Sequence, residues 1–526
     1  MQSPYLTQDH ELFRQSVRKF IETEVTPHIN EWEKEEHIPK QIWKRMGEMG
    51  FLGINYDEKE GGQNADFFYS VVFLEELSRT GSGGFAASVG VHQYLGTGHI
   101  AAVGSEELKQ KYLRAAINGE MVSALGISEP VAGSDVANIK TKAVREGDHY
   151  VINGSKVFIS NGYYCDFITL AVKTDPGMGL NGISLIVVDK NTPGFTATKM
   201  KKLGWRSSDM GELAFDNVRV PASNLIGEEN MGFYYIMEGF QIERLVTAIG
   251  SVATCEYAIE LTLKYINERE AFGKKIKQYQ TIRHELAQLA TEVEAAKQLT
   301  YYASWLYNQN LSCVRECSMA KLLATELNKK VTDTCLQCFG GYGYMQDFPM
   351  ERMFRDARGG TIAGGTSAIM REIISRMMID DVNYQSGYKK PAKSKPTNTI
   401  ENKTQEPVTI SVKKPSIEKP AKAHEIIRSL EWRLITEKAK GVNIIYHFDI
   451  DGDSGGKFTV TIKDERCSVE ENLKGDPKCI VKAKAQNFED VELGRTNAQM
   501  AVMMGKIKVS NIGSMLKFMD MFERLS

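Results

Sequence analysis

A composition break at residues 384–423 divides this chain into two parts. The segment from Tyr384 to Ala423 is rich in Lys, Pro and Thr and has almost no large apolar side chains. Such a sequence cannot bury enough apolar surface to fold, and it is typical of a flexible or polyproline-like tether. Its lysines could alternatively attract an anionic surface. The 526 residues therefore predict folded units on both sides, about three to four domains in all.

The overall composition excludes several classes of protein. Hydrophobic residues make up 42% and charged residues 25% of the chain, as in soluble globular proteins, and a net charge of −2 offers no field for nucleic acid. No apolar run is long enough to span a bilayer. Residues 1–10 lack the features of a secretory signal, which predicts a cytoplasmic protein, or one of an organelle matrix after loss of a transit peptide.

The eight cysteines do not point to a metal site. Two pairs are closely spaced, Cys313 with Cys317 and Cys335 with Cys338, but both lie in helical patterns with no His nearby. Zinc needs a set of thiolate, imidazole or carboxylate ligands around it. We therefore predict no metal and interpret these cysteines as small core residues.

The order of hydrophobic patterns predicts an α+β multidomain protein. Residues 1–121 have helical periodicity, which predicts an N-terminal α-helical domain. From 122 to 227, short β-branched runs alternate with Asn-Gly turns, which indicates a central antiparallel β-barrel. Long helical patterns over 228–383 predict a C-terminal four-helix bundle. The tether 384–423 and a small α/β domain over 424–526 complete the chain.

The small C-terminal domain combines a helix with a hairpin. Residues Glu425–Lys440 have helical periodicity, and the strands Ile444–Ile450 and Lys457–Ile462 flank a Gly-rich turn. This domain is also rich in methionine near its C-terminus. The flexible thioether side chain of methionine can line an adaptable apolar cavity, but it also fills ordinary cores. Both interpretations stay open for the methionines near its C-terminus, which are Met500, Met503, Met504, Met515 and Met519.

One carboxylate lies on an unusual helix face. In the apolar-periodic run from Gly232 to Gly273, Glu243 has small and apolar neighbours three and four positions away, and no Lys or Arg among them. Burial of an unpaired carboxylate is costly and raises its pKa, which is what a general base near neutral pH requires. Most acidic residues are exposed, however, so an incidental Glu at a helix edge is the alternative.

Three Gly-rich segments could bind a ligand, although none is a Rossmann fingerprint, a P-loop or a nucleophile elbow. The first, Gly126–Asp135, reads GISEPVAGSD and could present amides and hydroxyls to an anion; an ordinary turn is the alternative. The second is Gln337–Asp356. In the third, Gly364, Gly365 and Thr366 open a helix, whose amides can cradle a phosphate or a flavin edge.

In this order, the three segments make residues 1–383 resemble the acyl-CoA dehydrogenase family. Gly126–Asp135 and Gln337–Asp356 look like its two signature stretches, and Phe158–Asn161 and Arg269–Gly273 add to the similarity. The resemblance implies the helix, barrel, helix fold described above. It also implies FAD as cofactor.

The resemblance also implies which residues hold FAD. Ser128 and Ser160 would donate toward the polar edge of the isoalloxazine ring, and a neighbouring subunit would supply Gln337, Gly340 and Gly341. The full set is Leu125, Ile127, Ser128, Gly133, Ser134, Phe158, Ile159 and Ser160 around the ring; Arg269, Phe272, Gln280, Gln337, Gly340 and Gly341 at the pyrophosphate and adenosine; and Thr366 and Ser367 closing the site.

The position of the catalytic base distinguishes subgroups of this family. Most members place a Glu one residue before the Gly-Thr of the third segment, where this chain has Gly364, which cannot remove a proton. Long-chain and isovaleryl-CoA dehydrogenases place it on the long helix after the barrel, next to an Arg. Glu243-Arg244 fits that pattern, and Gly227–Met237 resembles the long-chain type closely.

The implied reaction is α,β-dehydrogenation of a medium-chain, long-chain or branched acyl-CoA. Glu243 would act as the base, and FAD would pass the electrons on to an electron-transfer flavoprotein. The resemblance also implies a homodimer or homotetramer. An acyl-CoA oxidase using O2 and a non-catalytic acyl-lipid carrier or scaffold are the alternatives. The implied substrate-binding residues are Ser134, Tyr234, Gln241, Arg244, Gly364 and Gly365.

The last hundred residues resemble the sterol carrier protein type 2 domain. The similarity rests on Tyr446–Ile450 with Gly455–Val460, and on Met504–Val509. It implies a lipid-binding domain with an apolar tunnel for a lipid or an acyl-CoA, and no catalytic residues.

Overall fold

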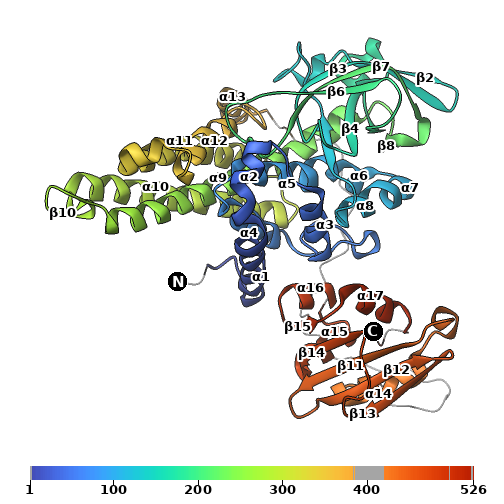
Figure 1. Ribbon diagram of the computed structural model, residues 1–526. Helices are drawn as coiled ribbons and strands as arrows, with labels where there is room; N and C mark the ends of the chain where they lie inside the picture. Colours follow the sequence, from blue (N-terminus) through green and yellow to red (C-terminus); the bar gives the residue numbers. More distant parts are fainter. Residues whose placement is uncertain (1–2, 383, 385–419, 497, 523–524, 526) are drawn as a thin grey trace. The chain divides into compact units, whose positions relative to one another are not determined.

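The protein is described by a computed structural model that covers residues 3–382, 384, 420–496, 498–522 and 525. It divides into two compact units, Met1–Lys393 and Ser394–Ser526 (Figure 1). Most of the predicted tether, 384–423, lies outside the described residues.

The first 121 residues form helices around one that is buried on all sides. Every residue of α4, from Phe67 to Ser78, is buried, because other helices cover each face and Arg14 of α1 pairs with its two carboxylates, Glu75 and Glu76. Asp66 caps its first turn by accepting from the Phe68 amide. The helices are α1 (Gln8–Phe20), α2 (Ile29–Glu35), α3 (Lys40–Glu48), α4 (Phe67–Ser78), α5 (Gly83–Gly90), α6 (Gly98–Val103), α7 (Glu106–Leu108) and α8 (Arg114–Ile117).

A twisted sheet follows, in the strand order β6-β7-β3-β2-β4-β5-β8 with β1 beside β4. The prediction of a closed antiparallel barrel is wrong. Within the described residues β6 and β8 remain edge strands, and β4 pairs in parallel with both β1 and β2. The strands are β1 (Ser123–Gly126), β2 (Lys142–Glu146), β3 (His149–Ser160), β4 (Phe167–Lys173), β5 (Ile183–Asp189), β6 (Phe195–Lys199), β7 (Met210–Pro221) and β8 (Leu225–Ile226).

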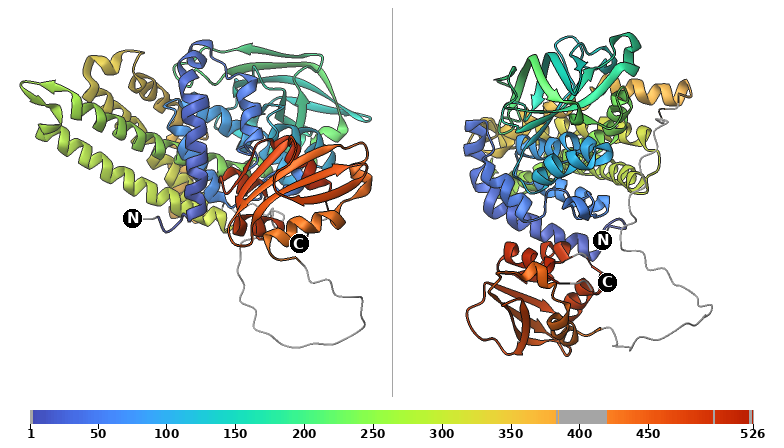
Figure 2. Two further views of the ribbon diagram at one scale, coloured as in Figure 1. Left: turned by 60° about the horizontal axis from the view of Figure 1, so that its bottom comes forward. Right: turned by 90° about the vertical axis from the view of Figure 1, so that its right-hand side faces the viewer.

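Long helices return after the sheet, as predicted. The 37-residue helix α9 packs on α4, α10 and α11, and α12 and α13 pack on α11. A short hairpin joins α9 to α10 at the end of the helices that points away from the sheet in Figure 1 and in the left view of Figure 2. The elements are α9 (Gly232–Glu268), β9 (Glu270–Ala271), β10 (Lys274–Lys275), α10 (Gln280–Asn308), α11 (Val314–Phe339), α12 (Pro349–Gly360) and α13 (Ser367–Ile379).

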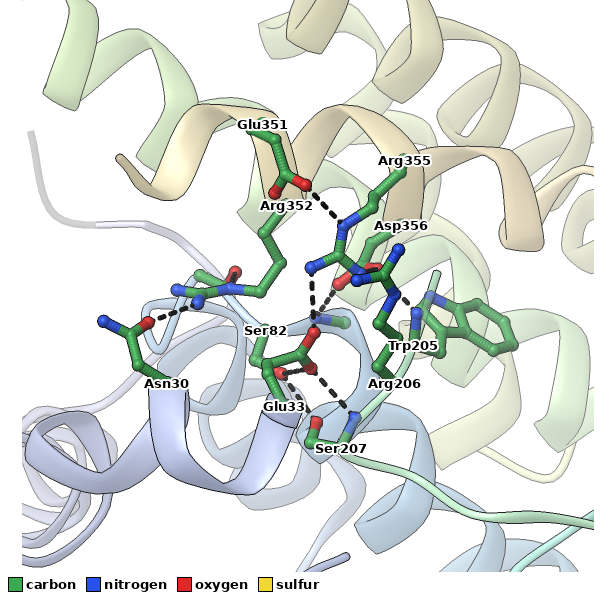
Figure 3. Close-up of polar contacts among 12 residues, drawn as sticks. Asn30, Glu33, Ser82, Trp205, Arg206, Ser207, Glu351, Arg352, Arg355 and Asp356 are labelled. Carbon is green, nitrogen blue, oxygen red and sulfur yellow. Dashed lines mark hydrogen bonds and ion pairs between the residues drawn. The ribbon is translucent and has the colours of Figure 1, made fainter. Parts of the chain in front are cut away.

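A buried polar network ties these three regions together (Figure 3). Glu33 on α2 accepts from the Ser207 amide at 2.9 Å and from Arg355 Nη2 on α12 at 3.0 Å. Asp356, also on α12, accepts from the amides of Trp205 at 2.6 Å and Gly83 at 3.0 Å. These four contacts all cross between regions, so they fix the sheet against both sets of helices.

The second unit is a five-stranded sheet in the order β13-β12-β11-β14-β15. The predicted hairpin is β11 with β12, and β14 pairs in parallel with β11. The helix predicted over Glu425–Lys440 ends at Arg433, where Leu434 becomes extended. The elements are α14 (Ala423–Arg433), β11 (Ile444–Asp451), β12 (Gly456–Lys463), β13 (Arg466–Glu471), β14 (Cys479–Lys484), α15 (Ala485–Glu492), α16 (Ala498–Met503), β15 (Ile507–Val509) and α17 (Ile512–Asp520).

The core of this unit is mostly aromatic and aliphatic. Tyr446 and Phe448 from β11 pack against Phe518 of α17, with ring centroids 4.7 and 5.4 Å away. Met504 is buried and Met515 packs against the core, whereas the side chains of Met500 and Met503 lie outside the description. Of these methionines, Met515 is thus placed against the core of the sheet.

Candidate active site

Glu243 lies on α9 with its carboxylate against the turn that precedes α13. A Cβ added at Gly364 would lie 3.4 Å from Glu243 Cγ and 3.5 Å from its Oε1. The side chain is half-buried, and no hydrogen bond or ion pair within the described part of the chain engages its carboxylate. The long helix and the Gly364 turn therefore meet at one unpartnered carboxylate.

The surroundings of Glu243 change its pKa. Burial raises the pKa above its ordinary value, and the positive charges of Arg244 and Lys321 lower it in part. Because no donor within the described ranges stabilises the charged form, desolvation prevails. The carboxylate thus has the property that a general base needs.

The turn facing Glu243 depends on glycine. Gly364 and Gly365 have φ of +64° and +90°, in the left-handed region that side chains disfavour. Thr366 then caps α13 by accepting from the Ile369 amide at 3.3 Å. The ammonium of Lys321, from α11, donates to the Gly365 carbonyl. Two neighbouring helices therefore anchor the turn.

Arg244 follows Glu243 but points into the bundle. It is buried, its Nη1 lies 3.5 Å from Ser318 Oγ, and its Nε has no hydrogen-bond partner in the described part of the chain. Its guanidinium carbon lies 5.8 Å from the centre of the Phe240 ring. Burial lowers its pKa and the charge of Glu243 raises it.

The first signature loop is anchored by a buried ion pair. Lys156, from β3, donates to Glu129 Oε1 at 2.8 Å and to the Ile127 carbonyl at 3.0 Å. Glu129 also accepts from the amides of Lys140 at 2.5 Å and Thr141 at 3.0 Å. Burial lowers the pKa of Lys156 to about 8, although Glu129 opposes this. The pair therefore fixes the loop to strand β3.

The groups around this loop face open space. Phe158 has a φ of +59° and is 61% exposed, a strained conformation for an aromatic residue. Nothing lies within 4 Å of a Cβ added at Gly133. Among the described residues, no hydrogen bond occupies the hydroxyls of Ser128, Ser134 and Ser160. Leu125 is half-buried at the end of β1, and Ile159 is buried.

These two parts of the site share a neighbour. Both β1, which carries Leu125, and α9 pack against a π-helical turn at Val91–Gly96. π-Helical turns are often found at functional sites. The strand that leads into the loop and the helix that carries Glu243 thus pack on the same element.

Other residues predicted for FAD lie at the far end of the helices. Arg269 ends α9 with its guanidinium 5.7 Å from the Tyr342 ring, and Phe272 is 96% exposed. Gln280 starts α10, and Gln337, Gly340 and Gly341 are exposed at the end of α11. Glu243 and Arg269 are 26 positions apart, about 39 Å along a helix. The structure therefore does not bring this group together with Glu243.

The last predicted residues have mixed surroundings. Ser367 donates its hydroxyl to Glu326 at 2.5 Å and its amide to the Thr361 carbonyl, so both of its donors are used. The Tyr234 hydroxyl donates to Asn181 at 3.0 Å. Gln241 donates to Glu238 and accepts from the Cys313 thiol.

The chemistry of these groups fits FAD. Near the sheet, free hydroxyls, an open Gly-containing loop and an exposed aromatic ring suit a flat polar ring system. At the far end, an exposed guanidinium and the unobstructed Gly340 and Gly341 suit a pyrophosphate. These features are compatible with such a cofactor.

Sequence reasoning missed two buried lysines of this site. Lys321 lies on the buried stripe of α11 with Cys317 and Ala324, and a Lys on an apolar helix face is a readable signal. Lys156 lies on the same buried face of β3 as Tyr150 and Ile152, because residues an even number of positions apart share a face of a strand. Neither signal reveals which carbonyl or carboxylate the lysine binds.

Comparisons with known proteins agree with this architecture. Residues 7–120, 124–218 and 230–379 match the acyl-CoA dehydrogenase N-terminal, middle and C-terminal domains. Residues 429–523 match the SCP-2 sterol transfer family. The mouse mitochondrial long-chain specific acyl-CoA dehydrogenase is 38% identical over 71% of this chain and 87% of its own length.

Solved structures give the same result. The acyl-CoA dehydrogenase of Geobacillus kaustophilus is 44% identical, with a TM-score of 0.70 over 72% of this chain and all of that chain. A glutaryl-CoA dehydrogenase of Mycobacterium smegmatis in complex with FADH2 is 27% identical, with a TM-score of 0.68 over 72% of this chain and 97% of that chain.

The chain belongs to the acyl-CoA dehydrogenase family, with an SCP2 lipid-binding domain after the dehydrogenase domains. It is an FAD-dependent acyl-CoA dehydrogenase, so the predictions of enzyme class, cofactor and acyl-CoA substrate are confirmed. Within the described residues, no helix has both the length and the apolarity needed to cross a membrane.

Proposed function

We propose that this protein oxidises a medium-chain, long-chain or branched acyl-CoA to the trans-2-enoyl-CoA, with Glu243 as the base. The observation that carries the proposal is the unpartnered Glu243 carboxylate against Gly364. A Glu at position 364 would compete for this space, and glycine leaves it to the carboxylate from α9. The pKa of Glu243, raised by burial, suits proton removal near neutral pH.

In the proposed reaction Glu243 removes the proton from the α-carbon of the thioester. An acyl chain over the carboxylate would exclude water and raise the pKa of Glu243 further. FAD, when bound, accepts the hydride from the β-carbon. Hydrogen bonds to the thioester carbonyl would stabilise the charge that develops on its oxygen.

The proposed cofactor site has contributions from two subunits. Leu125–Ser134, Phe158–Ser160, Thr366 and Ser367 would surround the ring near Glu243. The others lie at the far end of the long helices, too far from Glu243 to serve the same ring; they are Arg269, Phe272, Gln280 and Gln337–Gly341. We assign them to the pyrophosphate and adenosine in a homodimer or homotetramer in which these ends meet neighbouring sites.

The substrate-binding residues that we propose are those that the resemblance to the family implies. The six are Ser134, Tyr234, Gln241, Arg244, Gly364 and Gly365. The name of the mouse relative, a long-chain specific enzyme, supports a long acyl chain. An electron-transfer flavoprotein is the proposed electron acceptor, and peroxide release with O2 as the sole acceptor would instead indicate an oxidase.

The decisive experiment measures dye reduction over a panel of acyl-CoAs. The parent should be active and Glu243→Gln should keep FAD but lose turnover. Combining Glu243→Gly with Gly364→Glu should restore part of the activity, at a strain cost of about 1–2 kcal/mol for a side chain at positive φ. Full activity of Glu243→Gln would exclude Glu243 as the base.

We further propose that the SCP2 domain raises the local concentration of a poorly soluble acyl-CoA. A truncation after Lys393 removes this unit but leaves Tyr384, which lies near Arg244. The truncated enzyme should have a higher KM for long-chain substrates and an unchanged KM for short ones. Equal effects on both would contradict the proposal.

A further inference from the structure

Lys321 is a buried lysine that the proposed reaction does not use. It lies in the middle of α11 with no exposed surface, and its ammonium donates to the Gly365 carbonyl. No salt bridge of 4.0 Å or less joins it to a carboxylate among the described residues. A buried ammonium without an ion-pair partner is costly, and burial lowers the pKa of Lys321 to about 8.

The position of this ammonium relates it to the candidate base. Gly365 follows Gly364, the residue whose missing side chain gives Glu243 its space. The charges acting on Glu243 are those of Arg244 on its own helix and Lys321 on α11. Those acting on Lys321 are Glu243, Arg244 and, further along α11, Glu326. Lys321 thus contacts one side of the site and acts electrostatically on the other.

We propose that Lys321 is a positioning residue for proton removal, which holds the Gly364–Gly365 turn in place and keeps Glu243 ionised at neutral pH. This inference rests on the proposed role of Glu243. The hydrogen bond fixes a turn of two glycines, which would otherwise have wide conformational freedom. The positive charge favours the carboxylate form that accepts the proton. Arg244, whose charge also acts on Glu243, cannot hold the turn, because its side chain points toward Ser318.

A purely structural lysine would make a different prediction. If Lys321 only filled the bundle, its replacement would lower stability and FAD content but would leave the ionisation of Glu243 unchanged. If it acts on Glu243, removal of its charge raises the pKa of the base. The acid limb of the pH–rate profile, which is the low-pH range in which protonation of the base lowers the rate, then moves to higher pH.

The test compares the parent with Lys321→Gln, Lys321→Arg and a control, Lys330→Gln. Gln can still donate to Gly365 but has no charge, whereas Arg keeps both. Lys330 is on the same helix but is exposed and paired with Glu292 at 2.7 Å. FAD content, anaerobic flavin bleaching by lauroyl-CoA from pH 6 to 9, and hydrogen exchange of residues 359–370 without substrate are measured.

In Lys321→Gln the acid limb should move up by roughly one pH unit, which makes bleaching about tenfold slower below the limb. The difference from the parent should shrink above pH 8, where Lys321 itself loses its charge. Lys321→Arg should keep the parent limb and the parent exchange of the turn. Lys330→Gln should match the parent in every measurement.

An unchanged limb in Lys321→Gln with full FAD content, while Glu243→Gln is inactive, would overturn this inference and leave the proposed function intact. An active Glu243→Gln would instead overturn the proposed function. If Lys321→Gln retains no FAD, the Arg variant carries the test. If the acid limb of Lys321→Arg moves to higher pH although the charge is retained, the role of Lys321 is refuted. If both the acid limb and the hydrogen exchange of residues 359–370 match the parent, the role is supported.

Discussion

Two groups of buried or half-buried carboxylates in the same unit differ in what surrounds them. In the network of Figure 3, Glu33 and Asp356 accept hydrogen bonds from three backbone amides, and Arg355 contacts both. Glu243 has no such donor within the parts of the chain described. The first group joins three regions of the fold, whereas the second faces the turn at Gly364.

For Glu33 and Glu243, the comparison shows that hydrogen bonds and nearby charges, more than burial, decide the direction of the pKa shift. Burial opposes ionisation of Glu33, but hydrogen bonds from Ser207 and the charges of Arg355 and Arg352 lower its pKa overall. Glu243 has only distant charges to offset burial, and its pKa rises. Asp356 also accepts hydrogen bonds, but burial and the charge of Glu33 outweigh them and raise its pKa.

The largest expected effect is on kcat, when Glu243 is replaced by Gln; the same replacement of Glu33 serves as the comparison. Glu243→Gln should lower kcat by on the order of 10³-fold, because the amide cannot take a proton. Its melting temperature should stay unchanged or rise, since a desolvated charge is removed. Steady-state kinetics and thermal unfolding of the FAD-loaded enzyme measure both.

Glu33→Gln is the matched control. It should keep most of kcat but lose about 1.5–3 kcal/mol of unfolding free energy, the usual contribution of a hydrogen bond to a charged group. A Glu33→Gln enzyme that is stable but inactive would contradict the division between the two groups.

The second expected effect is on stability alone. Arg355→Met removes the cation between Glu33 and Asp356 and leaves two buried carboxylates facing each other. Loss of one partner of a buried ion pair costs about 3–5 kcal/mol. Denaturant unfolding should show this loss, and a change below about 1 kcal/mol would mean that the amides alone satisfy both carboxylates.

A third carboxylate, Glu129, tests whether a carboxylate close to the proposed cofactor loop takes part in the reaction. Its partner Lys156 and two amides satisfy it. Lys156→Met should therefore lower FAD retention and cost about 2–3 kcal/mol, because the amides remain. The pH dependence of flavin bleaching in the remaining holoenzyme should match the parent, and a shifted acid limb would place Glu129 with Glu243 instead.

The smallest expected effect is the pH dependence of stability at Asp356. Burial and the charge of Glu33 raise its pKa above the ordinary 3.8. The folded state then binds this proton more tightly than the unfolded state, so the contribution is present at low pH and lost as pH rises above about 4. Unfolding free energies from pH 4 to 8 should therefore shift in favour of Asp356→Asn. A constant difference would show that Asp356 is charged throughout.

Much of the first unit could be predicted from local pattern. The long helices and the β-rich middle region have clear periods, and the family motifs directed attention to Glu243 once Gly364 was seen to lack a carboxylate. The closed barrel was wrong because strand pairing is set by long-range contacts. Nothing in the local sequence of β4 reveals its parallel pairing with β1.

The partners of buried charges were harder to predict. Lys321 reaches a carbonyl 44 positions away, and Glu33 reaches Arg355 over 322 positions. Helical and strand periods identify which face is buried but not what a charged side chain meets there. The end of α14 at Arg433 was missed for a related reason, because the periodicity of the sequence continues past the residue where the backbone becomes extended.

The length of α9 has a consequence for dilute solutions of the enzyme. A rod of 37 residues, about 55 Å long, carries the base near one end and Arg269 at the other. If one FAD molecule needs both ends, it must bridge two copies of the chain, and its binding is linked to their association. We expect FAD to dissociate more readily as the protein is diluted and added FAD to promote assembly. The flavin would then report how many copies are present as well as what they oxidise.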